Sequence, residues 1–344
     1  MVTRSHVLRT LGAAVTVAGL PSIARAAAPV DLAIGQIGNN SVAFFPIFVA
    51  QHEGYFRDAG LNVTVNVFQS GAVVGAAMTS GSIDIGCSVI TDVFSLLKAS
   101  RPVKIIGSLV NGYYVDIIGS NAFLQSAKVS RSSPLHDRVE ALRGKRIGIT
   151  GPGSGTEALV VYLLTRAGLN PTRDAVLVNV GTDQAAILAE LRTGRLEAVS
   201  FAWPLSMVAD TEKVGEALIM PALGDVPAMQ GEVQAVMYGR PDILEKRQDA
   251  AVAFVRAIAR AEAFIGANHA AARTLLEQYD KLLMPDTVTK LLAAYLPVLP
   301  AKPVIDRNAY GRALTFHLLT GNATNVGTAF NDVIATSIID AATH

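Results

Sequence analysis

The chain has 344 residues, with 29 Lys or Arg against 28 Asp or Glu, which leaves a formal net charge of +1. A charge this close to zero gives no electrostatic reason to expect nucleic acid or a strongly charged surface as the partner. Hydrophobic residues make up 51% of the sequence and charged residues 17%. This balance is typical of a globular chain that is long enough for two lobes rather than one.

The first 28 residues have the layout of a secretory signal peptide. Met1 to Arg9 contains basic but no acidic residues, and Leu11 to Leu20 is apolar and uncharged. This run is shorter than the ~20 residues that span a bilayer. Small residues follow, as at a cleavage site. We therefore expect export to the periplasm and cleavage after about Ala26 or Ala28. An amphipathic helix of a cytosolic protein is the alternative, but its charges would be interspersed.

The cysteine content bears on both export and folding. Cys87 is the single cysteine of the chain, so an exported protein of this size has no disulfide framework and must be held together by its core. No cysteine stands near the expected cleavage site, which leaves no point for lipid attachment. Arg4 is followed by Ser5, which favours the general secretory route over the twin-arginine route.

The first half of the mature chain alternates short apolar strands with helices. Pro46 falls in the first turn of a predicted helix, where its missing N–H costs little, and Gly60 ends that helix. The pattern predicts strands over 30–35, 61–68, 83–86 and 103–109, and helices over 44–59, 71–80 and 88–100.

After a polar loop over 125–137 the pattern starts again. It predicts strands over 145–150, 175–180 and 198–202 and helices over 155–168 and 182–193, and from about residue 241 the chain is mostly helical. Repeated strand–helix units favour parallel sheets that are covered on both faces. The sequence therefore predicts an α/β protein with two lobes.

Two further short strands bracket the second run, at 115–119 and 235–238. If the first carries the chain across to a second lobe and the second returns it, residues 29–114 and 239–344 form lobe 1 and residues 115–238 form lobe 2, after the signal peptide at 1–28. Two crossovers make a hinge with a cleft between the lobes. Ligands bind outside the carboxyl ends of the strands in such sheets, and both sheets would point those ends into the cleft.

Three segments resemble a known family. They are Ala50 to Leu61, with the pattern A-x-x-x-G-Y-F-x-x-x-G-L, Gly81 to Gly86 (GSIDIG) and Leu142 to Gly148 (LRGKRIG). The mature chain resembles the periplasmic substrate-binding proteins of nitrate/sulfonate/taurine ABC transporters, a group that also includes thiamine-precursor-like members. The resemblance implies a two-lobed periplasmic binding protein fold of type II that acts as a monomer. It also implies capture of a small molecule without a cofactor and delivery to an ABC permease with its cytoplasmic ATPase.

The residues themselves suggest where a ligand binds. Helix N-termini offer free N–H groups and a favourable dipole for a polar or anionic group, and glycine allows close backbone approach. Each of these positions can also be a plain helix N-cap. Three such sites follow predicted strands: Ser70 and Gly71; Cys87, Ser88 and Thr91; and Gly153, Ser154, Gly155 and Thr156.

Aromatic side chains would form the walls of this cleft. Trp203, the single tryptophan, directly follows a predicted strand, which puts it at the carboxyl end of the sheet. Tyr113 and Tyr114 precede the first crossover, and Asn40 and Phe45 follow the first strand. Core packing is the alternative for each of these rings.

The cleft residues also limit the ligand. No Lys or Arg stands among them, whereas a dianion such as phosphate would be expected to have an Arg fork. We expect a small organic anion (a sulfonate, taurine or a carboxylate) or a neutral, partly aromatic compound. The glycine-rich Gly151 to Thr156 lacks the Lys of a nucleotide-binding P-loop, and the histidines are scattered, so we expect neither nucleotide nor metal binding.

Three classes of function are open. The first is a solute-binding protein of an ABC importer, the second is a periplasmic sensor domain that presents its ligand to a receptor, and the third is an enzyme. A eukaryotic group with this fold makes the thiamine pyrimidine, and that chemistry is associated with several cysteines and an active-site histidine. A chain with Cys87 as its single cysteine does not match that pattern. We interpret it as a transport protein and not an enzyme.

Overall fold

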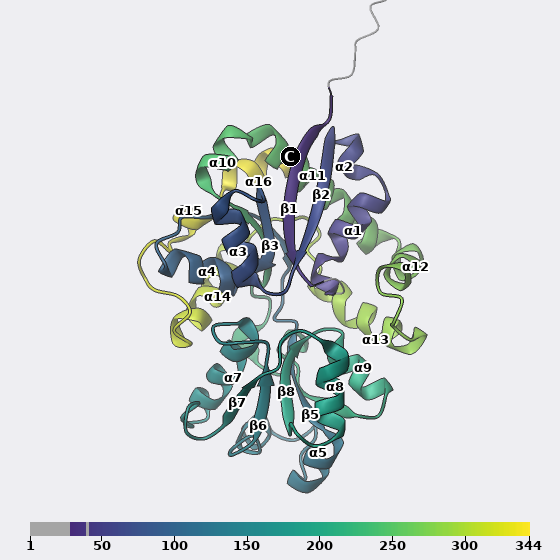
Figure 1. The fold of residues 1–344 in the computed structure, drawn as a ribbon, viewed down its shortest axis with the longest axis vertical. Helices are drawn as coiled ribbons and strands as arrows, with labels where there is room; N and C mark the ends of the chain where they lie inside the picture. Colours follow the sequence, from purple (N-terminus) through teal and green to yellow (C-terminus); the bar gives the residue numbers. More distant parts are fainter. Residues whose placement is uncertain (1–27, 39–40) are drawn as a thin grey trace, which may run out of the picture.

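The computed structural model describes residues 28–38 and 41–344, so the expected signal peptide and Asn40 lie outside the described residues. The described chain forms two α/β lobes stacked along the long axis of the molecule (Figure 1). No helix in this part of the chain is both long and apolar enough to cross a membrane.

The first lobe is built on a five-stranded sheet. Its strands are β1 (Val30–Ile37), β2 (Leu61–Phe68), β3 (Ile85–Val89), β4 (Lys104–Val110) and β10 (Ala235–Gly239), in the order β2-β1-β3-β10-β4. β1 pairs in parallel with β2 and β3, and β10 runs antiparallel between β3 and β4. Four strands of this sheet therefore run in one direction and β10 runs in the other.

Helices cover both faces of the first sheet (Figure 1). Cys87 and Met237 face a core that includes α1 and α11, whereas Val236 and Tyr238 face a core that includes α3, α4 and α14. The helices of this lobe are α1 (Phe45–His52), α2 (Tyr55–Asp58), α3 (Gly71–Ser80), α4 (Ile90–Lys98), α10 (Pro241–Lys246), α11 (Gln248–Ala267), α12 (His269–Tyr279), α13 (Pro285–Tyr295), α14 (Arg307–Leu319), α15 (Phe330–Val333) and α16 (Thr336–Thr343).

The second lobe repeats the plan with a second five-stranded sheet, in the order β7-β6-β8-β5-β9. β6 pairs in parallel with β7 and β8, and β5 runs antiparallel between β8 and β9. Its elements are β5 (Val115–Ser120), α5 (Asn121–Ala127), α6 (Leu135–Glu140), β6 (Arg146–Ile149), α7 (Gly155–Arg166), β7 (Val176–Asn179), α8 (Gln184–Arg192), β8 (Ala198–Ala202), α9 (Leu205–Thr211) and β9 (Gly215–Ile219).

Most predicted elements are confirmed, and the strands at 61–68 and 198–202 match to the residue. The single helix predicted over 44–59 is wrong, because Gly54 has a φ of 75° and divides it into α1 and α2. The polar loop predicted over 125–137 contains the end of α5 and the start of α6. The third strand ends three residues later than predicted, at Val89, with consequences for the site.

The crossovers between the lobes lie beside the predicted strands rather than in them. β5 pairs within the second sheet and β10 pairs within the first, so the chain crosses at 111–114 and returns at 230–234. Residues 235–238, which the sequence analysis assigned to lobe 2, therefore belong to the sheet of lobe 1. Their pairing with β3 and β4 is a long-range contact that the local pattern does not contain.

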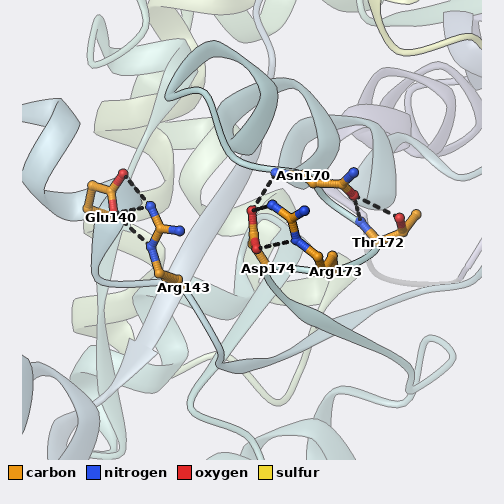
Figure 2. Close-up of polar contacts among 6 residues, drawn as sticks. All are labelled: Glu140, Arg143, Asn170, Thr172, Arg173 and Asp174. Atoms are coloured by element: carbon orange, nitrogen blue, oxygen red, sulfur yellow. Dashed lines mark hydrogen bonds and ion pairs between the residues drawn. The ribbon is translucent and has the colours of Figure 1, made fainter.

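Exposed ion pairs gather near the amino ends of β6 and β7 (Figure 2). Arg143 pairs with Glu140 at 3.0 Å, and Arg173 pairs with Asp174 at 3.1 Å. The hydrogen bond from Arg173 is the main cause that lowers the pKa of Asp174. Exposed pairs of this kind contribute little to stability. They lie at the opposite sheet edge from the carboxyl ends, so they take no part in the candidate site.

Candidate functional site

The two sheets direct their carboxyl edges toward each other. Ala235 at the start of β10 pairs with Val89 and Val110 at the ends of β3 and β4. In the second sheet, Val115 at the start of β5 pairs with Ala202 at the end of β8. The crossovers join these ends. We call the region between the edges, from Phe68, Val89 and Val110 to Ile149 and Ala202, the interlobe seam.

Loops from the two lobes touch across the interlobe seam. The Tyr113 hydroxyl, from the first crossover, donates to the Gly155 carbonyl at 2.5 Å. Thr182 donates to the side chain of Gln69 at 3.4 Å, and the Asn322 amide donates to the Gly153 carbonyl at 3.2 Å. The lobes are therefore in contact in this structure.

Two helices from the C-terminal part of the chain also reach the second lobe. Lys290 of α13 forms an ion pair with Asp210 of α9, and the Thr287 hydroxyl of α13 donates to that of Thr211 at 3.0 Å. On the other side, Phe316 of α14 packs 5.1 Å from the rings of both Tyr113 and Tyr162. The seam is thus flanked by α13 and α14.

The predicted glycine and serine positions at α3 act as a helix start. The Ser70 Oγ accepts from the Val73 N–H at 3.4 Å, which confirms a helix N-cap. Gly71 leaves no space for a side chain, because a Cβ there would lie 1.8 Å from Oδ2 of Asp92. The Asp92 carboxylate therefore lies directly against the N-terminus of α3, a contact for which the local sequence contains no signal.

Cys87 and Ser88 do not stand at a helix N-terminus, so that prediction is wrong. Both lie inside β3, where they pair with Met237 and Val236 of β10. Cys87 is buried, which raises the pKa of its thiol. The Ser88 hydroxyl is also buried and donates to the Tyr238 hydroxyl at 3.1 Å. The prediction failed because β3 pairs with β10, about 150 residues further along the chain, and this pairing makes β3 longer than its local sequence pattern indicates.

Thr91 is buried in the first turn of α4, and its hydroxyl is hydrogen-bonded within the first lobe. Its Oγ1 lies 2.7 Å from Nε2 of His317, whose Nδ1 lies 2.7 Å from the Ala313 carbonyl. A carbonyl can only accept, so Nδ1 donates to it and Nε2 accepts from Thr91. Burial lowers the pKa of His317 to about 4, so this imidazole is neutral.

The glycine-rich loop before α7 is held by its own hydrogen bonds. The Ser154 Oγ accepts from the Glu157 N–H at 3.2 Å, which confirms a second helix N-cap. The Thr156 Oγ1 accepts from the Thr150 N–H at 2.9 Å, and the Gly153 N–H donates to the Glu157 carboxylate at 2.5 Å. The backbone of Gly155 packs closely against the first lobe, because a Cβ added to this glycine would lie 3.3 Å from Oγ1 of Thr91.

Trp203 is buried at the end of β8 and is fixed by a carboxylate. Its Nε1–H donates to Oδ2 of Asp116 at 2.8 Å, and the Ser206 hydroxyl donates to the same oxygen at 2.5 Å. The ring of Tyr114 lies 6.5 Å from that of Trp203, edge to face. Burial raises the pKa of Asp116 to about 7 against these two hydrogen bonds. The sequence signal for the role of Asp116 is its position as a single carboxylate within a predicted apolar strand.

Phe45 belongs to an aromatic cluster in the first lobe. Its ring lies 5.7 Å from Tyr279 of α12 and 6.3 Å from Phe48. The Tyr279 hydroxyl donates to the Ser41 carbonyl at 3.0 Å, so α12 fixes the segment that follows β1. The Phe45 side chain is fully buried and packs in the core of the first lobe.

A groove of about 490 Å³ lies between α4, α7 and the turn after α14. Lys98 and Glu157 bring opposite charges to it, and the Lys98 ammonium donates to the Gly321 carbonyl at 2.6 Å. Within residues 28–38 and 41–344, no three His, Cys, Asp or Glu side chains are grouped so that they could hold a metal ion.

The fold and the interlobe seam define the class of two-lobed periplasmic binding protein folds. The family model described as the NMT1-like family matches residues 25–278, so the chain belongs to the NMT1-like family. The resemblance and the fold class predicted from the sequence are confirmed at this level.

Solved structures with this fold include solute-binding proteins. The chain is 16% identical to the periplasmic nitrate-binding protein NrtA from Synechocystis PCC 6803, with a TM-score of 0.68 over 91% of this chain and 88% of that one. It is 18% identical to the alkanesulfonate-binding protein SsuA from Xanthomonas axonopodis pv. citri, with a TM-score of 0.69 over 91% and 99%. At these identities the likeness establishes the fold.

Curated relatives match over shorter lengths. The chain is 25% identical to a Bacillus subtilis protein described as a binding protein, YtlA, over 67% of this chain and 65% of that one. It is 28% identical to a 4-amino-5-hydroxymethyl-2-methylpyrimidine phosphate synthase of Uromyces fabae, over 31% of this chain and 28% of the synthase. The chain thus spans less than two thirds of the length of these two relatives.

Proposed function

We propose that this chain is the periplasmic solute-binding component of an ABC importer. The observation that carries the proposal is the facing arrangement of two α/β sheets, whose carboxyl edges meet at a seam that two crossovers join. Ligands bind at such edges in open α/β sheets. Membership of the NMT1-like family and the fold shared with NrtA and SsuA support the same function.

Hinge closure is the proposed mechanism. The crossovers at 111–114 and 230–234 let the lobes rotate as rigid bodies, and a ligand that contacts both lobes selects the closed state. The permease would then recognise the closed form as the loaded one. The proposed ligand is a small organic anion or a neutral, partly aromatic compound.

The proposed site takes its residues from both lobes. Trp203 and Tyr114 supply aromatic walls at the seam, and the loops before α3 and α7 reach it through Gln69 and Gly153. Asn40, outside the described residues, stays part of the prediction. The remaining proposed residues are Phe45, Ser70, Gly71, Thr91, Tyr113, Gly153, Ser154, Gly155 and Thr156. Cys87 and Ser88 are not kept, because both lie inside β3.

The experiment combines a ligand panel with a measurement of closure. Purified mature protein is screened by thermal shift against sulfonates, taurine, nitrate and aromatic carboxylates and amines, because a ligand that binds the folded state raises the melting temperature. For each hit, small-angle scattering should show a smaller radius of gyration at saturation, and Trp203 fluorescence should change in the same titration. A Trp203→Phe variant has no tryptophan, so it should lose the fluorescence change and shows that the signal comes from Trp203 rather than from the ligand or from turbidity. A panel with no hit, or hits that leave both signals flat, contradicts the proposal.

An enzyme related to the pyrimidine phosphate synthases is the second candidate, because several of them match part of the chain. Two groups argue against it. Cys87 is buried and its thiol pKa is raised, so it is a poor nucleophile. His317 is neutral and its two ring nitrogens are both hydrogen-bonded within the first lobe. Neither group is placed for chemistry at the seam.

A further inference from the structure

The Asp92 carboxylate occupies the place where a helix N-terminus would receive an anion. Gly71, the first residue of α3, lies so close to it that a Cβ on Gly71 would lie 1.8 to 2.3 Å from the carboxylate atoms. A helix N-terminus favours one negative charge, and here the chain supplies that charge itself. A second anion at this point would meet both steric exclusion and like-charge repulsion.

One oxygen of this carboxylate keeps its capacity to accept a hydrogen bond. Oδ2 of Asp92 is buried and has no hydrogen-bond partner among the residues that the structure describes. Burial is the main cause that raises the pKa of the Asp92 carboxyl to about 6. A buried acceptor without a donor is costly, so a ligand that supplies one gains that energy on binding.

No basic side chain among the described residues offsets the charge of Asp92. Burial is the main cause that raises the pKa values of Asp92, Tyr114 and Tyr238, and no Lys, Arg or His of the described chain lowers any of the three. Asp92 lies close enough to Tyr114 and Tyr238 to raise the pKa of each phenol. The surroundings of the carboxylate are therefore aromatic, with no positive charge from the described residues to offset it.

Aromatic faces near an unpaired carboxylate suit a particular kind of group. The ring of Tyr114 stands edge to face with Trp203 at the seam, and the faces of such rings attract cations. Gln234, at the second crossover, is fully buried with both amide atoms unpartnered, and it lies 3.7 Å from the Cβ position of Gly155. The seam thus offers an unpartnered carboxylate oxygen, an amide that can accept or donate, and π faces, rather than positive charge.

We propose that the Asp92 carboxylate receives an N–H donor of the ligand, so that the seam selects small amines, amidines or similar nitrogen compounds over anions of the same shape. This inference rests on the proposed function and narrows its ligand class. It favours the neutral, partly aromatic compound over the organic anion among the expected ligands, and it adds positively charged nitrogen compounds to them.

Three probes of one shape test the inference. Benzamidine, benzamide and benzoate share a ring and a planar head group but differ in charge and in N–H donors. Thermal shifts at pH 7.5 should be largest with benzamidine, smaller with benzamide and absent with benzoate. Asp92→Asn should weaken benzamidine binding by about tenfold to a hundredfold, the loss typical of a hydrogen bond to a charged group. Its melting temperature without ligand shows that the variant is folded.

Asp183→Asn is the matched control. Asp183 caps α8 in the second lobe through the N–H groups of Ala185 and Ala186, and Asn is an equally good cap. This variant removes the same charge, so benzamidine binding should be unchanged. A shift with benzoate as large as that with benzamidine, no shift with benzamidine, or equal binding by Asp92→Asn overturns the inference.

Methanesulfonate and nitrate, run beside the three probes, separate this inference from the proposed function. If they alone raise the melting temperature and reduce the radius of gyration, the protein binds solutes but the nitrogen-donor class is wrong. If no probe of either charge changes either quantity, the proposed function fails as well.

Discussion

Replacing Asp116 with Asn should remove a large part of the pH dependence of stability. Asp116 is buried beneath Trp203, and its Oδ2 accepts from the Trp203 indole and the Ser206 hydroxyl. Its other oxygen, Oδ1, is buried with no partner among the described residues. Desolvation therefore outweighs the hydrogen bonds and raises the pKa from 3.8 to about 7.

The sign and size follow from linkage. Between the unfolded pKa near 3.8 and the folded pKa of about 7, the folded state binds more protons, so the free energy of unfolding falls as pH rises. At about 1.4 kcal/mol for each pH unit, the loss is about 2 kcal/mol by pH 5 and about 4 kcal/mol by pH 8. The wild-type protein should thus lose about 2 to 3 kcal/mol more than Asp116→Asn between these two pH values.

Urea denaturation at pH 5, 6, 7 and 8, followed by far-ultraviolet circular dichroism, measures the difference directly. Comparing each variant with the wild type cancels the titration of other groups, including Asp92 and His317, which are common to both. Asp174→Asn is the control, because the pKa of that surface carboxyl is lowered, mainly by its hydrogen bond with Arg173, and its loss should not reduce the fall in stability above pH 5. Parallel stability curves for wild type and Asp116→Asn would refute a protonated Asp116 beneath Trp203.

Three further outcomes are expected. Gly71→Ala should lower the free energy of unfolding by about 1–3 kcal/mol, because the new methyl group meets the Asp92 carboxylate. In Gly266→Ala of α11 the new methyl group has no neighbour within 4 Å, so the free energy of unfolding should rise by about 0.4–1 kcal/mol. An equal effect of the two substitutions would contradict the close contact between Gly71 and Asp92. Cys87, buried with a raised pKa, should react with a disulfide reagent only after unfolding, so rapid labelling of native protein would be inconsistent with this burial. Mass spectrometry of the exported protein should show a new N-terminus at Ala27 or Pro29, whereas intact Met1 on periplasmic protein would argue against signal-peptide cleavage.

The sequence by itself determined the order and type of most elements and the class of the fold. The alternation of Leu61–Phe68 and the apolar run Ala198–Ala202 depend on neighbouring residues, so local pattern was enough to place both strands. Ser70 and Ser154 were recognisable as helix starts for the same reason, since an N-cap hydrogen bond spans three residues. The signals for the family also lie in short contiguous segments.

Only the tertiary structure decided which polar groups meet at the seam. Ser88 bonds to Tyr238, 150 positions away, and Trp203 bonds to Asp116, 87 positions away. The insertion of β10 between β3 and β4 extends β3 and moves Cys87 and Ser88 into the sheet. The contact of Asp92 with Gly71 likewise requires α3 and α4 to pack together. Such pairings depend on how the whole chain closes on itself, and no local periodicity encodes them.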